Sequence, residues 1–384
     1  MSEYSYYEFQ AIDRQLTAAE RQELRLYSSR ASITASRFSN YYNWGDFRGN
    51  PAEWVVKYFD AYFYMANWRT RQLSFRLPKR LLDPNLARQY CCGELASLRV
   101  KGGCVILDFF CEDGEWDDYS DDGSGWLSAL APLRADVIAG DHRLLYLGWL
   151  YGVQLRLVPK GAPEPPVPAG LGDLTPALDA FVDLFKIDRD LIAAAAQASP
   201  RARPALSSRE IQSQVAALSS AEKVRWLVRL AGGQEPHLRE EFVKELSHSS
   251  TAATSDPRTV AAIRAAAGTI RQERERLEAM QAAAERAQRE RAAAEARDQR
   301  LVRLAKREAE AWRKVDALIA TRQPGKYDEA VALLLDLREI SVRKGREAKV
   351  EAKLHNLLEA HARKSTLVDR LRKAGLVKLG SRRK

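Results

Sequence analysis

Short segments rich in aromatic and β-branched residues recur through the first 111 residues, and this pattern is typical of β-strands. The last two of these segments flank the sequence Lys101-Gly-Gly103, which predicts a hairpin. The second arm of that hairpin is almost continuously apolar, as expected for a central strand. We expect strands over residues 4–12, 32–42, 72–77, 95–100 and 104–111.

Helical spacing of apolar positions alternates with these strands. Thr17 followed by Glu20 forms a capping-box pattern, which predicts a helix over 18–27. Pro51 suits the first turn of a helix, and the aromatic and aliphatic residues that follow predict that it continues over 52–68. Two more helices are expected over 126–138 and 141–153, joined at a left-handed Gly140 with Asp141 as the next N-cap. The first part of the chain therefore predicts an α+β head.

The rest of the chain is expected to be all-helical, with one long charged helix and a terminal helical hairpin. One helix is expected over 175–196, and the helical pattern of 208–246 is interrupted at Gly232-Gly233. The expected organisation is an aromatic-rich α+β domain over 1–157, a proline-rich connector over 158–172, a helical middle region over 173–246, a polar linker over 247–257, the long charged helix over 258–323, the helical hairpin over 324–376 and a basic tail over 377–384.

The long charged segment contains neither glycine nor proline over the 55 residues from Thr269 to Gln323. As a single helix these residues would extend for about 80 Å. Apolar residues keep a seven-residue spacing from Ile263 to Ala284, but the register fails at Arg291. A strong parallel coiled-coil dimer is therefore not expected, although oligomerisation through this helix stays open. We expect a helix that packs at its two ends and is solvated in between.

Charge is distributed unevenly along the chain. The first 200 residues hold 21 Lys and Arg against 26 Asp and Glu, and the remaining residues hold 40 against 25, which gives net charges of −5 and +15. This asymmetry suggests an anionic partner for the second half. No apolar run is long enough to span a bilayer, no secretory signal is seen, and the four cysteines lack metal-ligand spacing, so a cytoplasmic protein with reduced thiols and no cofactor is expected.

Seven carboxylates crowd the segment 112–122, where Asp118 and Asp122 imitate the first half of an EF-hand loop. The position that needs a bidentate glutamate holds Ala129, so a solvated acidic loop is the favoured interpretation and a Ca²⁺ or Mg²⁺ site the alternative. The only candidate ligands for a metal-dependent catalytic site on a strand are Asp108, on the predicted central strand, and Glu112 and Asp113 at its end. No nucleotide-binding, hydrolase or zinc-protease motif occurs, so the sequence predicts no catalytic residue.

Two further groups of residues are candidates for binding. The loop aromatics Trp44, Phe47 and Trp116 are candidates for contacting a partner protein, although most aromatics of the head are expected in its core. Cations near the C-terminus are candidates for contacting phosphates, together with the basic faces of 300–314 and 343–353. The cations that the sequence singles out are Arg370, Arg372, Lys373, Arg382, Arg383 and Lys384. They could equally complement helix dipoles at a frayed end.

Three segments of the first half, YYEFQAID at 6–13, YNWGDF at 42–47 and GDHRLLYLGW at 140–149, resemble a group of uncharacterised bacterial proteins. The segment 360–376 resembles the C-terminal helices of long bacterial SWIM zinc-finger proteins. The zinc-finger signature itself, Cys-x-Cys followed by Cys-x-His, is absent from this chain. The resemblance implies a bacterial cytosolic setting, and without that signature no metal-dependent or nucleic-acid activity is carried over from it.

These observations favour a non-enzymatic interaction or adaptor protein, in which the head binds a partner protein and the helical tail joins a larger assembly. The first alternative is a nucleic-acid-binding accessory protein that uses the basic C-terminal helices. A more distant alternative is a metal-dependent enzyme built around the acidic loop.

Overall fold

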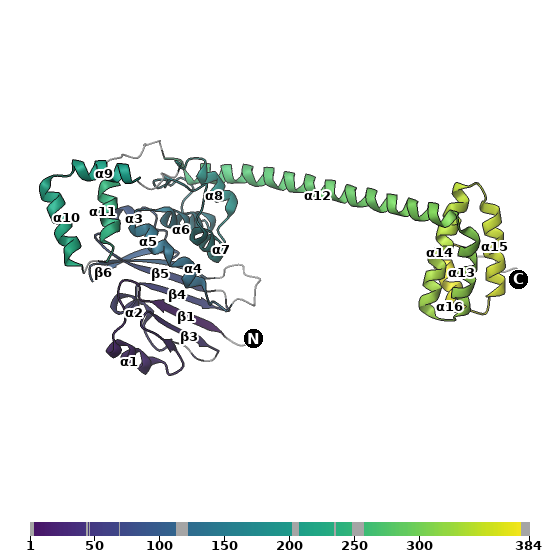
Figure 1. Ribbon diagram of the computed structural model, residues 1–384, viewed down its shortest axis with the longest axis horizontal. Coiled ribbons are helices and arrows are strands. Elements are labelled where there is room, and N and C mark those ends of the chain that lie inside the picture. The colour runs from purple at the N-terminus through teal and green to yellow at the C-terminus, as the bar shows by residue number, and fades with distance from the viewer. Residues whose placement is uncertain are drawn as a thin grey trace. The chain divides into compact units, whose positions relative to one another are not determined.

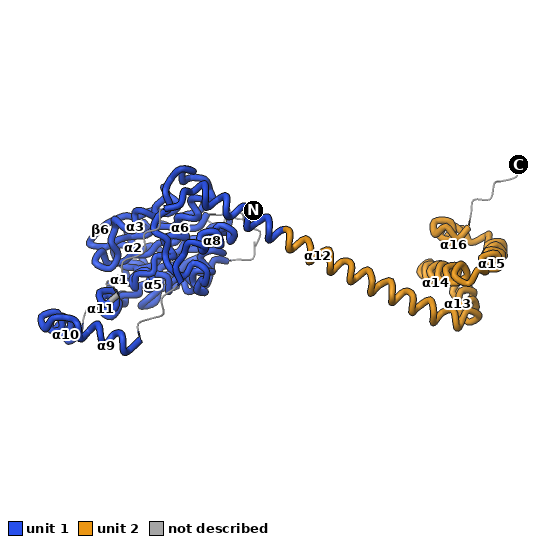
Figure 2. Tube along the Cα trace, turned by 90° about the horizontal axis from the view of Figure 1, so that it is seen from above, with its two compact units in different colours: residues 1–275 blue, residues 276–384 orange. Residues whose placement is uncertain are grey.

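The computed structural model describes residues 4–43, 45, 47–68, 70–112, 122–201, 207–233, 236–247 and 257–377. The chain divides into two compact units, Met1–Glu275 and Arg276–Lys384, as Figure 2 shows in two colours. Unit 1 contains a sheet and helices, and the described part of unit 2 is helical. The predicted fold class, an α+β head followed by a helical region with one long helix, is confirmed.

Within the described residues, the sheet of unit 1 has seven strands in the order β2-β3-β1-β4-β5-β7-β6 (Figure 1). Every neighbouring pair is antiparallel. The predicted hairpin of β6 and β7 is confirmed, and β7 is paired on both sides. The strands are β1 (Ser5–Gln10), β2 (Ser32–Ile33), β3 (Arg37–Tyr42), β4 (Ala61–Ala66), β5 (Arg71–Pro78), β6 (Ala96–Lys101) and β7 (Cys104–Cys111).

The helix predicted over 52–68 is wrong beyond its first turns. Helix α2 (Pro51–Lys57) begins at the predicted proline, but 61–66 form β4, which pairs with β1 and β5 near the centre of the sheet. Five of the six residues of β4 are buried, so its two faces are both apolar and no alternation marks it as a strand. Pairing with two neighbouring strands outweighs a helical spacing that arises by chance in an apolar run.

Helices cover both faces of the sheet (Figure 1). Helices α1 (Ala18–Tyr27) and α2 cover one face over an aromatic core that includes Phe9, Phe38 and Trp54. The other face carries the larger core, beneath α3 (Pro84–Arg88), α4 (Trp126–Leu130), α5 (Pro132–Ile138), α6 (Arg143–Gln154), α7 (Pro176–Phe185) and α8 (Arg189–Ala196).

Two of the predicted helices are each split in two. The helix predicted over 126–138 breaks where Pro132 begins α5. The helix predicted over 175–196 breaks at Lys186, whose φ of 52° ends α7, and Asp188 then caps α8 through a hydrogen bond from the backbone N–H of Asp190. Gly140 takes the predicted left-handed conformation, and α6 begins after His142 instead of at Asp141.

The proline-rich segment 158–172 packs within unit 1 and holds the start of the long helix. The backbone N–H of Glu164 donates to the carbonyl oxygen of Arg258 at 2.7 Å. The buried Glu164 carboxylate accepts hydrogen bonds of 2.8 Å from the Arg258 guanidinium and also accepts one from the hydroxyl of Tyr146. This segment therefore anchors residues 258–261, directly before and within the first turn of α12 (Val260–Ala305).

Three helices, α9 (Ser208–Ala217), α10 (Ser220–Gly232) and α11 (Leu238–Ser247), form a small group within unit 1 that we call the helical module. Few of its side chains are buried. Among the described residues of α9 none is buried, and the buried apolar side chains of the other two helices are Trp226 and Leu246.

The described part of unit 2 contains α12 from residue 276 onward and four further helices around one core. Side chains along α12 from residue 271 to residue 300 are exposed, whereas both ends are packed, as predicted. The predicted continuation to residue 323 is wrong, because the helix breaks at Lys306-Arg307. Among the described helices none is both long and apolar enough to cross a membrane. The remaining helices of unit 2 are α13 (Glu308–Ala320), α14 (Pro324–Arg343), α15 (Glu347–Ala360) and α16 (Ser365–Lys373).

Candidate interaction surfaces

The aromatic residues predicted to contact a partner are only partly described. Trp44 and Trp116 lie outside the described residues. Phe47 is 8% exposed and belongs to the aromatic core, where its ring lies 5.0 Å from that of Tyr7 and 4.7 Å from that of Trp54. Phe47 therefore packs inside the head and contributes little surface to a partner.

The acidic segment shows no metal cage in its described part. Asp118 lies outside the described residues, and Asp122 accepts a hydrogen bond of 2.9 Å from the backbone N–H of Ser124. Hydrogen bonds from Ser124 lower the pKa of the Asp122 carboxyl, which accounts for this carboxylate without a cation. Within the described ranges, no group of three or more His, Cys, Asp or Glu side chains lies close enough together to hold a metal ion.

Asp108, the first candidate ligand of the alternative metal-dependent site, already has hydrogen-bond partners for both carboxylate oxygens. Its Oδ1 accepts from the hydroxyl of Ser74 at 2.5 Å, and its Oδ2 accepts from Arg99 at 2.8 and 3.0 Å. Glu112 is exposed at the end of β7, and Asp113 lies outside the described residues. The described contacts of Asp108 are those of a structural carboxylate across three strands.

The cations predicted to contact phosphates differ in how exposed and how paired they are. Arg370 donates to Asp328 at 2.6 Å, and its side chain is less exposed than that of Asp328. This ion pair neutralises the charge of Arg370 within unit 2. Arg372 lies 3.9 Å from Asp369 on the same helix, and Lys373 is exposed. Arg382, Arg383 and Lys384 lie outside the described residues.

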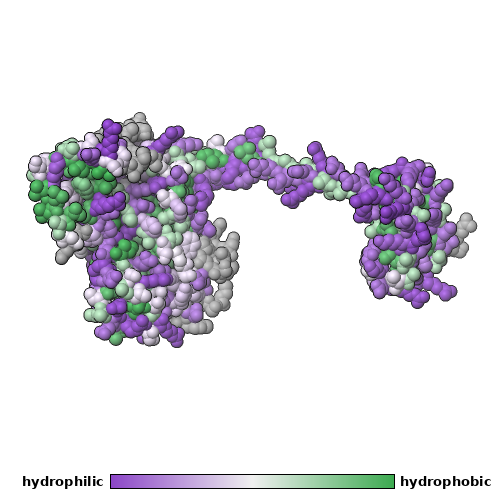
Figure 3. Space-filling view, in the orientation of Figure 1, coloured by the Kyte–Doolittle hydropathy of each residue, from purple (hydrophilic) through white to green (hydrophobic). Residues whose placement is uncertain are grey.

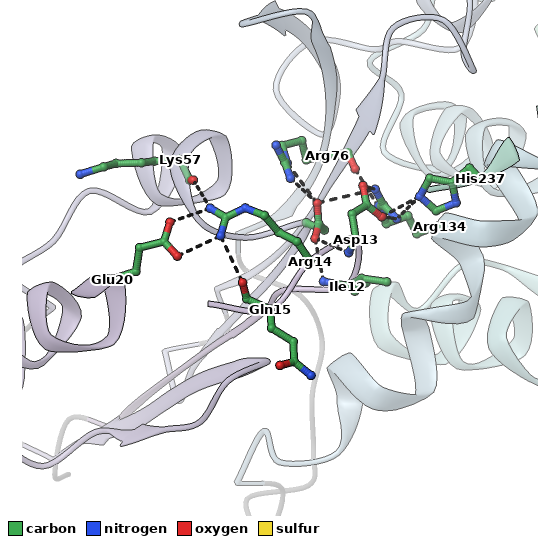
Figure 4. A network of polar contacts seen from close by, with 10 residues as sticks. Ile12, Asp13, Arg14, Gln15, Glu20, Lys57, Arg76, Arg134 and His237 are labelled. Atoms are coloured by element: carbon green, nitrogen blue, oxygen red, sulfur yellow. Dashed lines mark hydrogen bonds and ion pairs between the residues drawn. The ribbon is translucent and has the colours of Figure 1, made fainter. Parts of the chain in front are cut away.

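A buried polar network joins the helical module to the sheet (Figure 4). Asp13, three residues after the end of β1, lies between Arg134 of α5 and His237, which precedes α11. The Arg134 guanidinium is 2% exposed and donates to both oxygens of Asp13, at 2.8 and 2.7 Å. The Nε2 of His237 lies 2.6 Å from Oδ1 of the same carboxylate.

A second carboxylate completes the network on the side of the sheet. Asp60 is fully buried and accepts from the backbone N–H groups of Ile12 and Asp13 at 2.6 and 2.9 Å, and Arg76 contacts its other oxygen. Burial raises the pKa of Asp13, but hydrogen bonds from His237 and Arg134 outweigh it and hold the pKa well below its usual value. Asp13 is therefore ionised and is matched by the buried Arg134 cation.

A histidine beside an aspartate also occurs in nucleophilic active sites, where the histidine activates a hydroxyl or thiol. Within the described chain, the side-chain contacts of His237 are to Asp13 and Arg134, and neither is a nucleophile. His237 also has a left-handed backbone with φ of 67°, directly before α11. These contacts fix the helical module to the head, and we call the contacts among Asp13, Arg134 and His237 the polar latch.

Further polar contacts hold α11 on the head. Arg80 donates to Glu241 at 3.1 Å, and the Nζ of Lys244 donates to the carbonyl oxygen of Leu81 at 2.7 Å. Lys244 also acts on His142. Burial lowers the pKa of the His142 imidazole, and the positive charge of Lys244 lowers it further. Polar contacts of His237, Glu241 and Lys244 thus hold the module on the head.

The side of α10 that is directed to solvent is apolar. Four large side chains lie exposed along it: Val224 (58%), Leu227 (63%), Val228 (65%) and Leu230 (66%). We call this set the α10 face, and Figure 3 shows hydrophobic atoms gathered over α10. Positions 224, 227 and 228 share one side of a helix, because residues three and four apart are neighbours on its surface.

The opposite side of α10 packs inward through Trp226. Its ring lies 4.8 Å from that of Phe242 of α11, and the Arg229 guanidinium lies 4.7 Å from the indole ring. Trp226 is 7% exposed. Helix α10 therefore buries one large apolar side chain within unit 1 and exposes four to solvent.

Comparison with known proteins assigns neither a family nor a function to the chain. No protein-family model, no curated protein and no solved structure matches the chain. The likeness of three head segments and of 360–376 to bacterial proteins therefore stays a prediction, and function rests on the geometry of the described surfaces.

Proposed function

We propose that this protein is a non-enzymatic adaptor, in which the α10 face of unit 1 binds a partner protein and the helices of unit 2 join a larger assembly. The α10 face carries this proposal. Burying a Val or Leu side chain contributes about 1.5–3 kcal/mol, so four such side chains in water represent a considerable unused driving force for association. Scattered exposed apolar residues are common, but four within one helix of 13 residues are a contiguous surface.

The arrangement suits a helix that docks into a groove of another protein. Such helices insert apolar anchors at positions i, i+3 or i+4, and i+7. On α10 these positions are Val224, Leu227 or Val228, and Ala231, and all four residues are exposed. Capping by Ser219, whose hydroxyl accepts from the backbone N–H of Glu222 at 3.3 Å, fixes the start of the helix before any partner binds.

A second copy of this chain is the less favoured occupant of the α10 face. Stable dimers bury about 800 Å² on each partner. One helix face with four large apolar side chains provides less than such an interface needs, whereas inserting the same face into a groove buries it on both flanks. The polar latch at His237 also holds the module in a fixed position from which α10 can be presented.

The test compares three versions of the full chain by affinity capture with quantitative mass spectrometry, followed by reconstitution from purified proteins. The substituted face is V224S/L227S/V228S. The matched control is L277S/M280S, which removes apolar side chains that are 50% and 59% exposed on α12. We expect one defined protein to bind the wild type and the control, and to lose at least tenfold in affinity with the α10 variant.

The same preparations distinguish the alternatives. Light scattering after size exclusion reports self-association, and loss of a dimer in the α10 variant alone would replace the partner protein by a second copy. A partner that binds all three versions equally would refute the role of the α10 face.

A further inference from the structure

A groove runs across unit 2 where three helices meet, and it is separate from the α10 face. It has a volume of about 710 Å³. One side comes from the end of α12 and the break after it, the second from α13 and the third from α14. The residues that line it are Arg300, Arg303, Leu304, Lys306, Arg307, Lys314, Leu318, Glu329, Ala332, Leu333 and Asp336.

The floor of this groove is apolar. Leu304, Leu318 and Leu333 are half-buried, one from each of the three helices, and they pack against the core of unit 2 while leaving part of each side chain open. Such a floor accepts aliphatic or aromatic side chains of a ligand.

The walls carry five cations and two carboxylates, and both carboxylates are already paired. Asp336 pairs with Arg300, and Glu329 lies 2.6 Å from the Nζ of Lys326. The other four cations, Arg303, Lys306, Arg307 and Lys314, are exposed and form no ion pair with any residue in the described part of the chain. The groove therefore presents four uncompensated positive charges around an apolar floor.

We propose that this groove binds an acidic amphipathic helical segment of a partner protein. Apolar side chains on one side of such a helix would occupy the floor, and carboxylates on its flanks would face the four cations. Nucleic acid fits less well, because a phosphate backbone offers nothing apolar for Leu304, Leu318 and Leu333 and would approach the carboxylates of Glu329 and Asp336. This inference rests on the proposed adaptor function and specifies what the helices of unit 2 join.

The break at Lys306-Arg307 explains how so many cations gather here. Arg307 takes a non-helical conformation with φ of −123°, and α13 then begins at Glu308. A continuous helix would carry the chain past the bundle, whereas the break returns α13 alongside α14, so that Lys314 and Leu318 join the residues at the end of α12. The cations come from positions 14 residues or fewer apart in sequence, and the fold brings them to one groove.

The experiment is selection of random 16-residue peptides displayed on phage against the full chain, followed by fluorescence anisotropy of labelled selected peptides. The groove variant is R303E/R307E/K314E. The matched control, R286E/R291E/K101E, makes the same change in net charge at exposed cations outside the groove. Labelled duplex DNA and single-stranded RNA are titrated with the same proteins at low and high salt.

We expect the selected peptides to be rich in Asp and Glu and to carry apolar residues at helical spacing. The groove variant should weaken their binding at least tenfold, the control and the variant V224S/L227S/V228S less than twofold, and added salt should weaken it as well. Selected peptides without acidic residues, or equal binding to the groove variant, would overturn the inference. So would DNA or RNA binding that the groove variant abolishes while acidic peptides fail to bind, since the groove would then contact phosphates.

Failure of this inference and failure of the proposed function give different results. If peptides do not bind the groove but a partner is still captured through the α10 face, only the hypothesis of an acidic segment in the groove is refuted. If peptides bind the groove but no partner depends on the α10 face, the partner-binding role proposed for unit 1 is refuted instead.

Discussion

The Nε2 of His237 lies 2.6 Å from Oδ1 of Asp13, although the two residues are 224 positions apart in the chain. The same carboxylate is held by Arg134, so one aspartate connects the sheet, α5 and the start of α11. This relationship sets where the helical module sits within unit 1, and with it where the α10 face is presented. Because the latch consists of charged and polar groups, we expect charge-changing substitutions at Asp13 to loosen the module.

Asp13→Asn is expected to destabilise unit 1 by about 3 kcal/mol, because it leaves the buried Arg134 cation without its main charge partner. Hydrogen exchange in α11 should rise more than exchange in the central strands, because His237 loses the same carboxylate. Glu285→Gln is the control, since Glu285 and Arg289 form a surface pair of 3.8 Å that is expected to contribute less than 1 kcal/mol. Equal exchange in α11 before and after Asp13→Asn would show that the latch does not hold the module.

Acidification from pH 7.5 to 5.5 is expected to lower the stability of unit 1 through His142. Its folded pKa lies below its unfolded value of about 6.5, because burial and the charge of Lys244 disfavour the protonated ring, while Asp141 opposes them. Above about pH 6.5 the group makes no difference. As the pH falls below that value, the unfolded chain takes up the proton first, so stability declines until the folded pKa is reached.

The measurement for His142 is the urea midpoint at several pH values for the wild type and for His142→Asn, which should show a smaller decline. Asp13 does not interfere, because its pKa is lowered and its contribution disappears only below about pH 3.8. An identical decline in both proteins would assign the effect to other groups.

Trp226→Ala and Leu227→Ala are expected to behave in opposite ways, although the residues are adjacent. Trp226 is 7% exposed and packs on Phe242, so its removal should destabilise the module by about 3 kcal/mol. Leu227 is 63% exposed, and its replacement should change stability by less than about 0.5 kcal/mol while weakening partner binding. Hydrogen exchange of α10 and α11 in the free protein reports the first effect. A large loss of protection after Leu227→Ala would mean that the α10 face is covered within the chain.

Local signals in the sequence were sufficient where a few neighbouring residues decide the structure. Thr17 and Glu20 form the predicted capping box at α1, with hydrogen bonds of 3.2 and 2.8 Å. Lys101-Gly-Gly103 makes the predicted turn, in which Gly102 and Gly103 both have positive φ. In these places the conformation depends on caps and turn residues that are adjacent in the chain.

Signals that depend on distant partners could not be found in the sequence. Residues 61–66 are apolar on both sides, so only their pairing with β1 and β5 distinguishes a strand from a helix. Nothing near Asp13 points to His237, because no local pattern specifies a contact over 224 positions. The spacing of Val224, Leu227 and Val228 is visible in the sequence, but periodicity alone does not say whether an apolar face is covered by the same chain.

Two glycine-to-alanine substitutions within helices should change stability in opposite directions. A Cβ at Gly148 of α6 would lie 2.6 Å from Cε1 of the buried Phe109, so Gly148→Ala should destabilise unit 1 by about 1–3 kcal/mol through overpacking. A Cβ at Gly268 of α12 would meet no heavy atom within 4 Å, and its φ is not positive. Gly268→Ala should therefore stabilise α12 by about 0.5–1 kcal/mol, because alanine restricts the unfolded chain and favours the helix. Urea unfolding followed by circular dichroism measures both. A destabilised Gly268→Ala protein would mean that the start of α12 packs against a surface that closes over this position, and the exposed course of the helix beyond it would then need revision.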